Sequence, residues 1–165
     1  MNSTRLILLF FVLLFLQVFI FNNMVLLDYI TPFVYIVFVF YYPLKESRFL
    51  FLSVIFLLGL CVDFFTNTGG IHAFAILFSA YFRLFFIKLF FNKSEVDFPF
   101  FNLREEAYGK VFNYIISMTF IHHFLVLMFA NLTFKNMPTI LISAFLSSIF
   151  TIMIFMIGDI IFRKQ

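Results

Sequence analysis

Long apolar stretches dominate this chain and decide what it can fold into. Residues 6–21 are LILLFFVLLFLQVFIF, and further stretches of similar length follow, separated by short polar, proline or glycine segments. A helix that crosses a bilayer needs about 20 mostly apolar residues. Charged residues make up only 12% of the 165 positions, against about 25% in ordinary soluble domains. The sequence therefore predicts an all-α integral membrane protein with no separate soluble domain.

Six transmembrane helices in a single polytopic domain, residues 1–165, account for this pattern. The breaks place them at roughly residues 6–21, 25–42, 49–65, 71–90, 111–130 and 138–162. The second is the least regular, because Asp28, Thr31 and Pro32 fall in its first half and a proline is tolerated only in or before a first helical turn. The first resembles a signal peptide but lacks a small-residue cleavage site, so we expect it to remain uncleaved.

The basic residues orient these spans, since lysine and arginine accumulate on the cytoplasmic side of a membrane. Six spans with both termini cytoplasmic put Lys135 alone on the outer side, whereas deleting the second span would move Lys45 and Arg48 outside. The residues placed inside are Arg5, Lys45, Arg48, Lys88, Lys93, Arg104, Lys110, Arg163 and Lys164. Because they are spread over every inner loop, the net charge of +3 indicates membrane anchoring rather than nucleic-acid binding.

Two other features constrain the chain less. The single cysteine, Cys61, allows no internal disulfide. The cytoplasmic loop 91–110 mixes charges with the aromatic run Phe98-Pro99-Phe100-Phe101, which is typical either of an interfacial segment or of a docking surface for a cytoplasmic partner.

Ionisable residues inside a membrane are costly and are candidates for function. Asp63 ends the third predicted span, and His72 begins the fourth after the short turn TNTGG. This hairpin brings both side chains to one depth, where the carboxylate and the imidazole can pair or can jointly meet a partner. Gly70, next to Gly69, supplies the backbone freedom that a tight turn requires.

A polar stripe continues along the fourth span, where His72, Ser79 and Arg83 share one helical face. Alanines beside the stripe favour close packing with this face turned inward. Two alternatives remain open for Arg83: its side chain extends to the cytoplasmic interface, or it pairs inside the bundle with Asp159.

The fifth span carries His122 and His123 toward its outer side. Adjacent helical residues diverge by about 100° and do not form a chelating pair, so we predict no metal site. A bond from the Thr119 hydroxyl to His123, one turn away, is the simplest role. The four-residue steps of Ser143, Ser147 and Thr151 in the last span predict a helix-packing face.

No catalytic motif is present. The chain lacks HExxH, G-x-S-x-G and a phosphate loop, and REEAYGK at 104–110 only superficially resembles the glutamate motif of prenyl-type intramembrane proteases. We therefore expect a protein that is not an enzyme and has no cofactor.

One tract resembles a known family. GLCVDFFTNTGGIHAFAILFSAYFR is similar to the most recognisable stretch of the MreD family of rod shape-determining membrane proteins. The matching positions are Gly59, Asp63, Gly70, His72, Ala73 and Tyr81. The preceding NNMVLLDYITPFVYIVFVFYYPL and the later IHHF resemble the Bacteroidetes-type form of the family, whereas loop 91–110 has no counterpart in it.

The resemblance implies a non-catalytic component of the bacterial inner membrane that binds MreC directly. It would work in one complex with MreB, RodA and a class B penicillin-binding protein, and couple MreB filaments to peptidoglycan synthesis. The implied fold has six helices and is similar to the substrate-binding subunits of energy-coupling-factor transporters. A small-molecule permease subunit that uses the polar stripe with His122 or His123 is accordingly the alternative.

Overall fold

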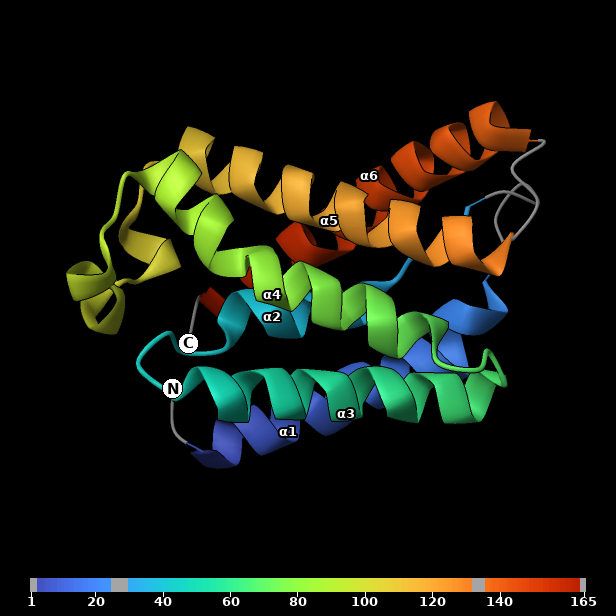
Figure 1. Ribbon diagram of the computed structural model, residues 1–165, viewed down its shortest axis with the longest axis horizontal. Coiled ribbons are helices and arrows are strands. Elements are labelled where there is room, and N and C mark those ends of the chain that lie inside the picture. Colours follow the sequence, from blue (N-terminus) through green and yellow to red (C-terminus); the bar gives the residue numbers. More distant parts are fainter. Residues whose placement is uncertain (1–2, 25–29, 132–135, 164–165) are drawn as a thin grey trace.

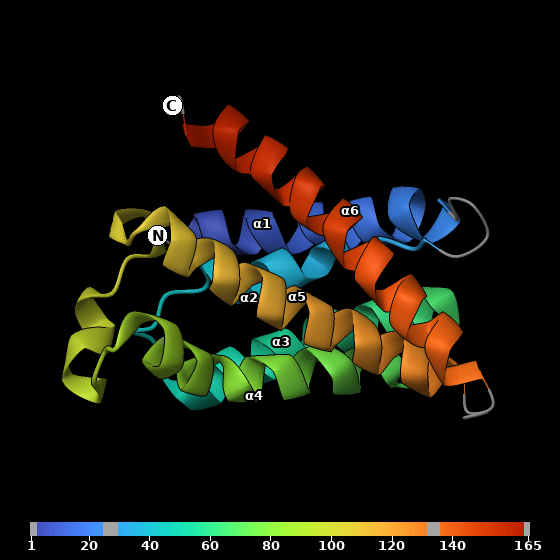
Figure 2. The same cartoon turned by 90° about the horizontal axis from the view of Figure 1, so that it is seen from above.

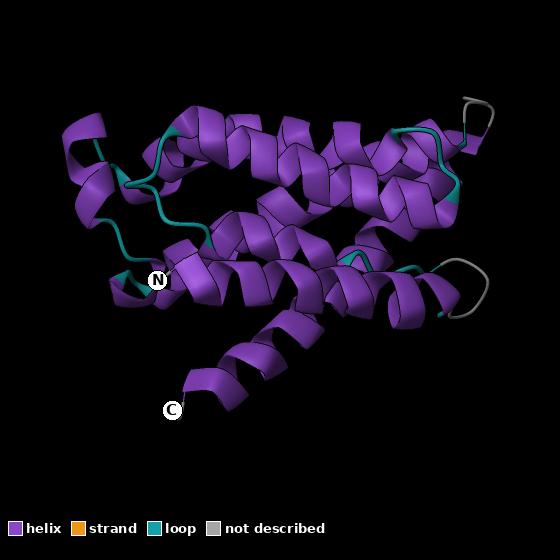
Figure 3. Cartoon of the chain, turned by 90° about the horizontal axis from the view of Figure 1, so that it is seen from below, coloured by secondary structure: helices purple, strands orange, loops and turns teal. Residues whose placement is uncertain are grey.

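A computed structural model describes residues 3–24, 30–131 and 136–163, and these residues form helices and connecting loops without any β-strand (Figures 1 and 3). The first helix, α1, is followed by a π-helical turn and a 3₁₀ turn, and short 3₁₀ turns also precede α2 and punctuate the loop after α4. The helix bounds are α1 Ser3–Phe15, α2 Val37–Tyr41, α3 Arg48–Thr66, α4 Ile71–Phe91, α5 Tyr108–Ala130 and α6 Met137–Arg163.

Within the described residues, five helices are long and apolar enough to cross a membrane. They cover Ser3–Asn23, Arg48–Thr66, Ile71–Phe91, Tyr108–Ala130 and Met137–Asp159. These match five of the six predicted spans closely, and they confirm an all-α protein of the multi-pass membrane class.

The segment around α2 differs from the predicted span over residues 25–42. Residues 25–29, including Asp28, lie outside the described residues, residues 31–33 are not helical, and a 3₁₀ turn at Val34–Ile36 leads into the short α2. Pro32 has no backbone N–H and disfavours the helical conformation at Thr31, so the helix begins only after it. We call residues 30–42 the broken segment.

The broken segment runs through the centre of the bundle (Figures 1 and 2). Every residue from Pro32 to Phe40 is buried. One end of the bundle, on the left of Figure 1, holds the start of α1, the start of α3, the loop after α4 and the end of α6. The turn between α3 and α4 lies at the opposite end.

The contact between α3 and α4 is close because Gly59 has no side chain. A Cβ atom added to Gly59 would lie 2.5 Å from the Cα atom of Ala73 and 2.8 Å from the Cγ2 atom of Ile76. The clash with Ala73 involves backbone, so a side-chain rearrangement cannot relieve it. Gly59 therefore sets the spacing of the two helices.

Replacing Gly59 with leucine should force α3 and α4 apart and lower the free energy of unfolding by about 2 kcal/mol or more, which is in the range for overpacked cores. The matched control is Gly158→Ala in α6, where an added Cβ meets nothing within 4 Å. Denaturation in mixed detergent micelles measures both variants. Equal stability of the two would contradict the close contact.

The loop between α4 and α5 is ordered by short polar contacts. The hydroxyl of Ser94 donates to the carboxylate of Asp97 at 2.7 Å, and Lys93 forms an ion pair with Glu106 at 3.1 Å. Hydrogen bonds from the Ser94 hydroxyl and amide hold the pKa of Asp97 below its ordinary value. Phe98 is buried whereas Phe100 is 85% exposed, so the loop presents one aromatic side chain to its surroundings.

Candidate functional site

Asp63 is buried at the end of α3 and holds the first turn of α4. Its Oδ1 atom accepts the backbone N–H of His72 at 3.0 Å, and its Oδ2 atom accepts the backbone N–H of Ala73 at 2.7 Å. The Thr68 hydroxyl donates to Oδ1 at 2.5 Å. The first N–H groups of a helix have no partner within the helix, and a carboxylate there also interacts favourably with the helix dipole. Asp63 thus acts as an N-terminal cap supplied by the preceding helix.

This geometry rules out one of the two alternatives for the hairpin, a direct pair between the Asp63 and His72 side chains. The carboxylate hydrogen-bonds the backbone of His72, while the imidazole bonds a different residue. The reason is the tight turn, in which Gly70 has a φ of 101° and places the amide groups of α4 directly over Asp63. A left-handed φ of this size is open to glycine and strained for other residues.

The His72 imidazole bonds Tyr35, a partner that sequence analysis did not predict for it. The hydroxyl of Tyr35 lies 2.8 Å from Nδ1 of His72 and 2.9 Å from Nε2 of His122. Tyr35 and His122 have no exposed surface, and His72 is 4% exposed. One hydroxyl in the broken segment therefore joins α4 to α5 through two imidazoles.

Three other side chains bond the backbone of the broken segment near its start. Gln17 of α1's π-helical extension donates to the carbonyl of Pro32 at 3.2 Å and accepts the N–H of Val34 at 2.7 Å. His123 accepts the N–H of Phe33 at 3.1 Å, and Ser147 of α6 accepts the N–H of Thr31 at 3.0 Å. Backbone groups at membrane depth have no water to bond, so non-helical backbone persists there only when protein groups replace the water.

Arg83 bonds the other end of the broken segment. Its Nη2 atom donates to the carbonyl of Tyr42 at 2.7 Å and, more weakly, to that of Phe40 at 3.4 Å. The guanidinium also lies over the ring of Phe51, with 5.1 Å to the ring centre. A cation at the last carbonyls of a helix is favourable because that end carries partial negative charge. We call Gln17, Arg83, His123 and Ser147 the clamp residues.

Both alternatives for Arg83 are wrong. The side chain is only 3% exposed, so it does not extend to the interface. Its hydrogen bonds go to backbone carbonyls, and Asp159 instead accepts the Tyr41 hydroxyl at 2.7 Å. The carbonyls at the end of the short α2 lie deep in the bundle and need a donor, which is why Arg83 turns inward.

The protonation state of His123 follows from its partners. Its Nε2 atom accepts a backbone N–H, so this nitrogen carries no proton, and its Nδ1 atom donates to the backbone carbonyl of Thr119 at 2.8 Å. The predicted bond to the Thr119 hydroxyl is therefore wrong. The hydroxyl of Thr151 also lies 2.9 Å from Nε2. A neutral imidazole suits these partners, with the Phe33 N–H and the Thr151 hydroxyl sharing the one lone pair of Nε2, and a charged one would lose the N–H of Phe33.

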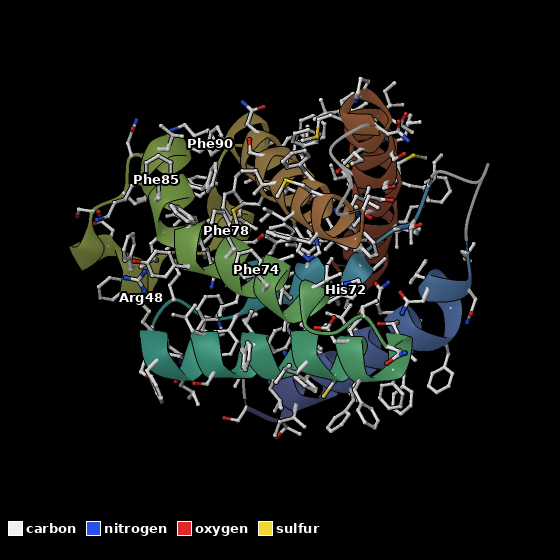
Figure 4. The ribbon with its side chains drawn as sticks, turned by 45° about the vertical axis from the view of Figure 1, so that its right-hand side comes forward. Arg48, His72, Phe74, Phe78, Phe85 and Phe90 are labelled. Atoms are coloured by element: carbon white, nitrogen blue, oxygen red, sulfur yellow. The ribbon has the colours of Figure 1, made fainter. Side chains whose placement is uncertain are left out.

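The remaining predicted positions have separate roles. Ser79 is buried and donates to the carbonyl of Ala75 in its own helix at 2.9 Å. Tyr81 is 55% exposed, and the guanidinium of Arg48 lies over its ring at 4.7 Å. The inward orientation of His72, Ser79 and Arg83 is confirmed, whereas Figure 4 shows Phe74, Phe78, Phe85 and Phe90 along the rest of the helix surface.

The serine and threonine steps of α6 are buried, as the packing prediction requires. Ser143, Ser147 and Thr151 are at most 8% exposed. Two of them do more than pack, because Ser147 and Thr151 bond the broken segment and His123. The sequence did hold a signal for these interior contacts. Gln17 and Tyr35 are polar residues within apolar stretches, and such residues need a hydrogen-bond partner inside the bundle.

The chemistry of this interior is that of internal hydrogen bonding. Within the described part of the chain, no group of three histidine, cysteine, aspartate or glutamate side chains is arranged to hold a metal ion. An open hollow of about 350 Å³ lies by the turn, lined by Thr68, Gly69, Gly70, Ile71, Phe74 and Phe129, and it contains none of the clamp residues.

The fold and its interior define an all-α multi-pass membrane protein whose central segment is interrupted and is held by side chains from four other helices. Comparison with protein families, curated proteins and solved structures gives no significant match to the chain.

Proposed function

We propose that this chain is a component of the bacterial cell-elongation machinery related to MreD, and that it acts by binding MreC. The single observation that carries the proposal is the role of the family-like tract in the hairpin of α3 and α4. Gly59 sets the helix spacing, Asp63 caps α4, and Gly70 permits the turn. These are the motif positions through which the tract resembles MreD, and together they make a rigid hairpin suited to presenting a binding surface.

The hydrogen bonds of this interior support a scaffold. The hydrogen-bonding atoms of Asp63, Gln17 and His123 bond the protein's own backbone and neighbouring hydroxyls, and so hold the fold together. In this proposal MreC binds directly, MreB lies on the cytoplasmic side, and RodA and a class B penicillin-binding protein complete the complex.

The proposed topology has six passes, of which the broken segment is the second, with both termini and loop 91–110 cytoplasmic in the bacterial inner membrane. The basic residues Lys45, Arg48, Lys88 and Lys93 belong to segments at one end of the bundle, together with the start of α1 and the end of α6 (Figure 1). This distribution supports a cytoplasmic location for that end.

The alternative is a permease subunit of the energy-coupling-factor type, and the broken segment favours it. Interrupted helices line substrate sites near the midplane of many transporters. In this protein, unlike in such transporters, clamp residues bond the non-helical backbone groups of Phe33, Val34 and Tyr42. A transporter of this type would need those groups to be released to a substrate.

Copurification and photocrosslinking from native membranes test the proposal. A photoreactive residue at Phe64, which is 82% exposed beside the turn, should crosslink to MreC. The matched control is Phe100, which is 85% exposed on the opposite end and should crosslink to cytoplasmic partners or lipid. Copurification of an ATPase module without MreC would overturn the proposal in favour of the permease.

A further inference from the structure

The hydroxyl of Tyr35 is shared by two imidazoles and can donate a hydrogen bond to only one of them. If it donates to Nε2 of His122, Nδ1 of His72 must carry a proton and donate to the hydroxyl oxygen; the reverse arrangement is equally complete. The distances of 2.8 and 2.9 Å suit both arrangements. The three side chains therefore form a hydrogen-bonded chain that keeps the same two bonds in either direction, provided that each imidazole takes the tautomer that the direction requires.

The same chain accepts one additional proton. With both ring nitrogens of His72 protonated, Nδ1 donates to Tyr35 and Tyr35 donates to Nε2 of His122, so both bonds remain. The charge can then move: the Nδ1 proton passes to the tyrosine oxygen while the hydroxyl proton passes to Nε2 of His122. A second proton would leave the buried hydroxyl hydrogen without an acceptor, which is costly.

Asp63 of α3 lies beside His72, because its carboxylate accepts the backbone N–H of this residue at 3.0 Å. A carboxylate at this position partly offsets the cost of burying a positive charge on the His72 ring. The other described titratable groups around His72 are Tyr35 of the broken segment and His122 and His123 of α5. From α6, the hydroxyl of Thr151, which does not titrate, bonds His123. His123 cannot take the proton at Nε2, because this atom accepts the N–H of Phe33.

His72 is the member of the chain nearest the surface. It lies in the first turn of α4, near the end of the bundle that carries the α3–α4 turn (Figure 4). Its side chain is 4% exposed, whereas Tyr35 and His122 have no exposed surface.

We propose that His72, Tyr35 and His122 form a binding site for a single proton, taken up from the side of the membrane that the α3–α4 turn faces. This site adds to the proposed scaffold function, because it places one titratable charge between α4, α5 and the broken segment while their hydrogen bonds are kept. It does not depend on which partner the protein binds.

Nitrogen NMR of histidine-labelled protein in lipid nanodiscs, from about pH 8 to about pH 5, tests the proposal across the ordinary pKa range of imidazole. We expect His72 and His122 to shift together with one midpoint and a total of one added proton, while His123 stays neutral with its proton on Nδ1. Separate midpoints for His72 and His122, or no protonation of either while the protein stays folded, would overturn the proposal.

A variant separates proton sharing from simple proximity. Tyr35→Phe keeps the ring and removes the hydroxyl, so His122 should no longer follow the titration of His72. Coupled titration that survives in this variant would exclude the hydroxyl as the bridge. The wild-type spectra alone remain decisive if the variant does not fold.

Discussion

Replacing Asp63 with alanine is expected to lower the free energy of unfolding by about 3 kcal/mol or more. Hydrogen bonds to a charged group contribute about 1.5–3 kcal/mol each, and the carboxylate accepts three, from the N–H groups of His72 and Ala73 and from the Thr68 hydroxyl. Two buried N–H groups at the start of α4 would be left without an acceptor. Denaturation in mixed detergent micelles, followed by circular dichroism, measures the change.

The conservative variant Asp63→Asn tests the same cap more finely. The asparagine amide keeps one acceptor oxygen, but its NH₂ group faces the other backbone N–H, which then has no acceptor. We therefore expect a loss of stability smaller than that of Asp63→Ala. Thr68→Val serves as the control, since it removes only the hydroxyl contact to Oδ1. Wild-type stability in Asp63→Ala would show that the carboxylate does not cap α4.

Replacing Gln17 with leucine is expected to cost about 2–5 kcal/mol. The amide bonds both the carbonyl of Pro32 and the N–H of Val34, and leucine leaves both without partners. Each unsatisfied buried group costs about 1–3 kcal/mol, and more where lipid excludes water. The broken segment should be destabilised more than the fold as a whole, because it has few other backbone hydrogen bonds around Pro32.

The matched control is Asn23→Leu at the end of the same helical run. The Asn23 amide is exposed and donates only to the carbonyl of Phe19, one turn earlier. A change within about 0.5 kcal/mol is expected, as for most surface substitutions. If Gln17→Leu were as mild as this control, the clamp would not hold the broken segment.

The helices were predictable because each one that crosses a membrane must be continuously apolar. The limits of α3 and α4 follow directly from Ser47, which caps α3 by accepting the N–H of Leu50, and from the glycine turn before Ile71. Composition and length were sufficient for these elements.

The broken segment shows where this reasoning stops. Pro32 signalled an irregular helix start, but whether such a chain continues as one helix or unwinds depends on side chains elsewhere that can bond its backbone. Gln17 and Ser147 provide those bonds from positions more than ten residues away in sequence. Periodicity within one helix carries no information about such partners.

The polar residues were located correctly and their partners were not. Sequence reasoning sought side chain to side chain pairs, namely Asp63 with His72, Arg83 with Asp159, and Thr119 with His123. In each case the bond goes instead to a backbone group. Arg83 bonds carbonyls that the broken segment leaves without helical partners. Asp63 bonds the N–H groups at the start of α4, which have no partner within that helix.

The central claim is that the clamp residues hold the broken segment in place of water. Amide hydrogen exchange at Phe33 and Val34 in lipid nanodiscs measures this most directly. The account predicts slow exchange at both amides in the wild type and about tenfold or greater acceleration in Gln17→Leu, corresponding to at least 1.4 kcal/mol, with little change at Ile55 in α3. Rapid exchange at Phe33 and Val34 in the wild type, or exchange that is unaffected by Gln17→Leu, would contradict it.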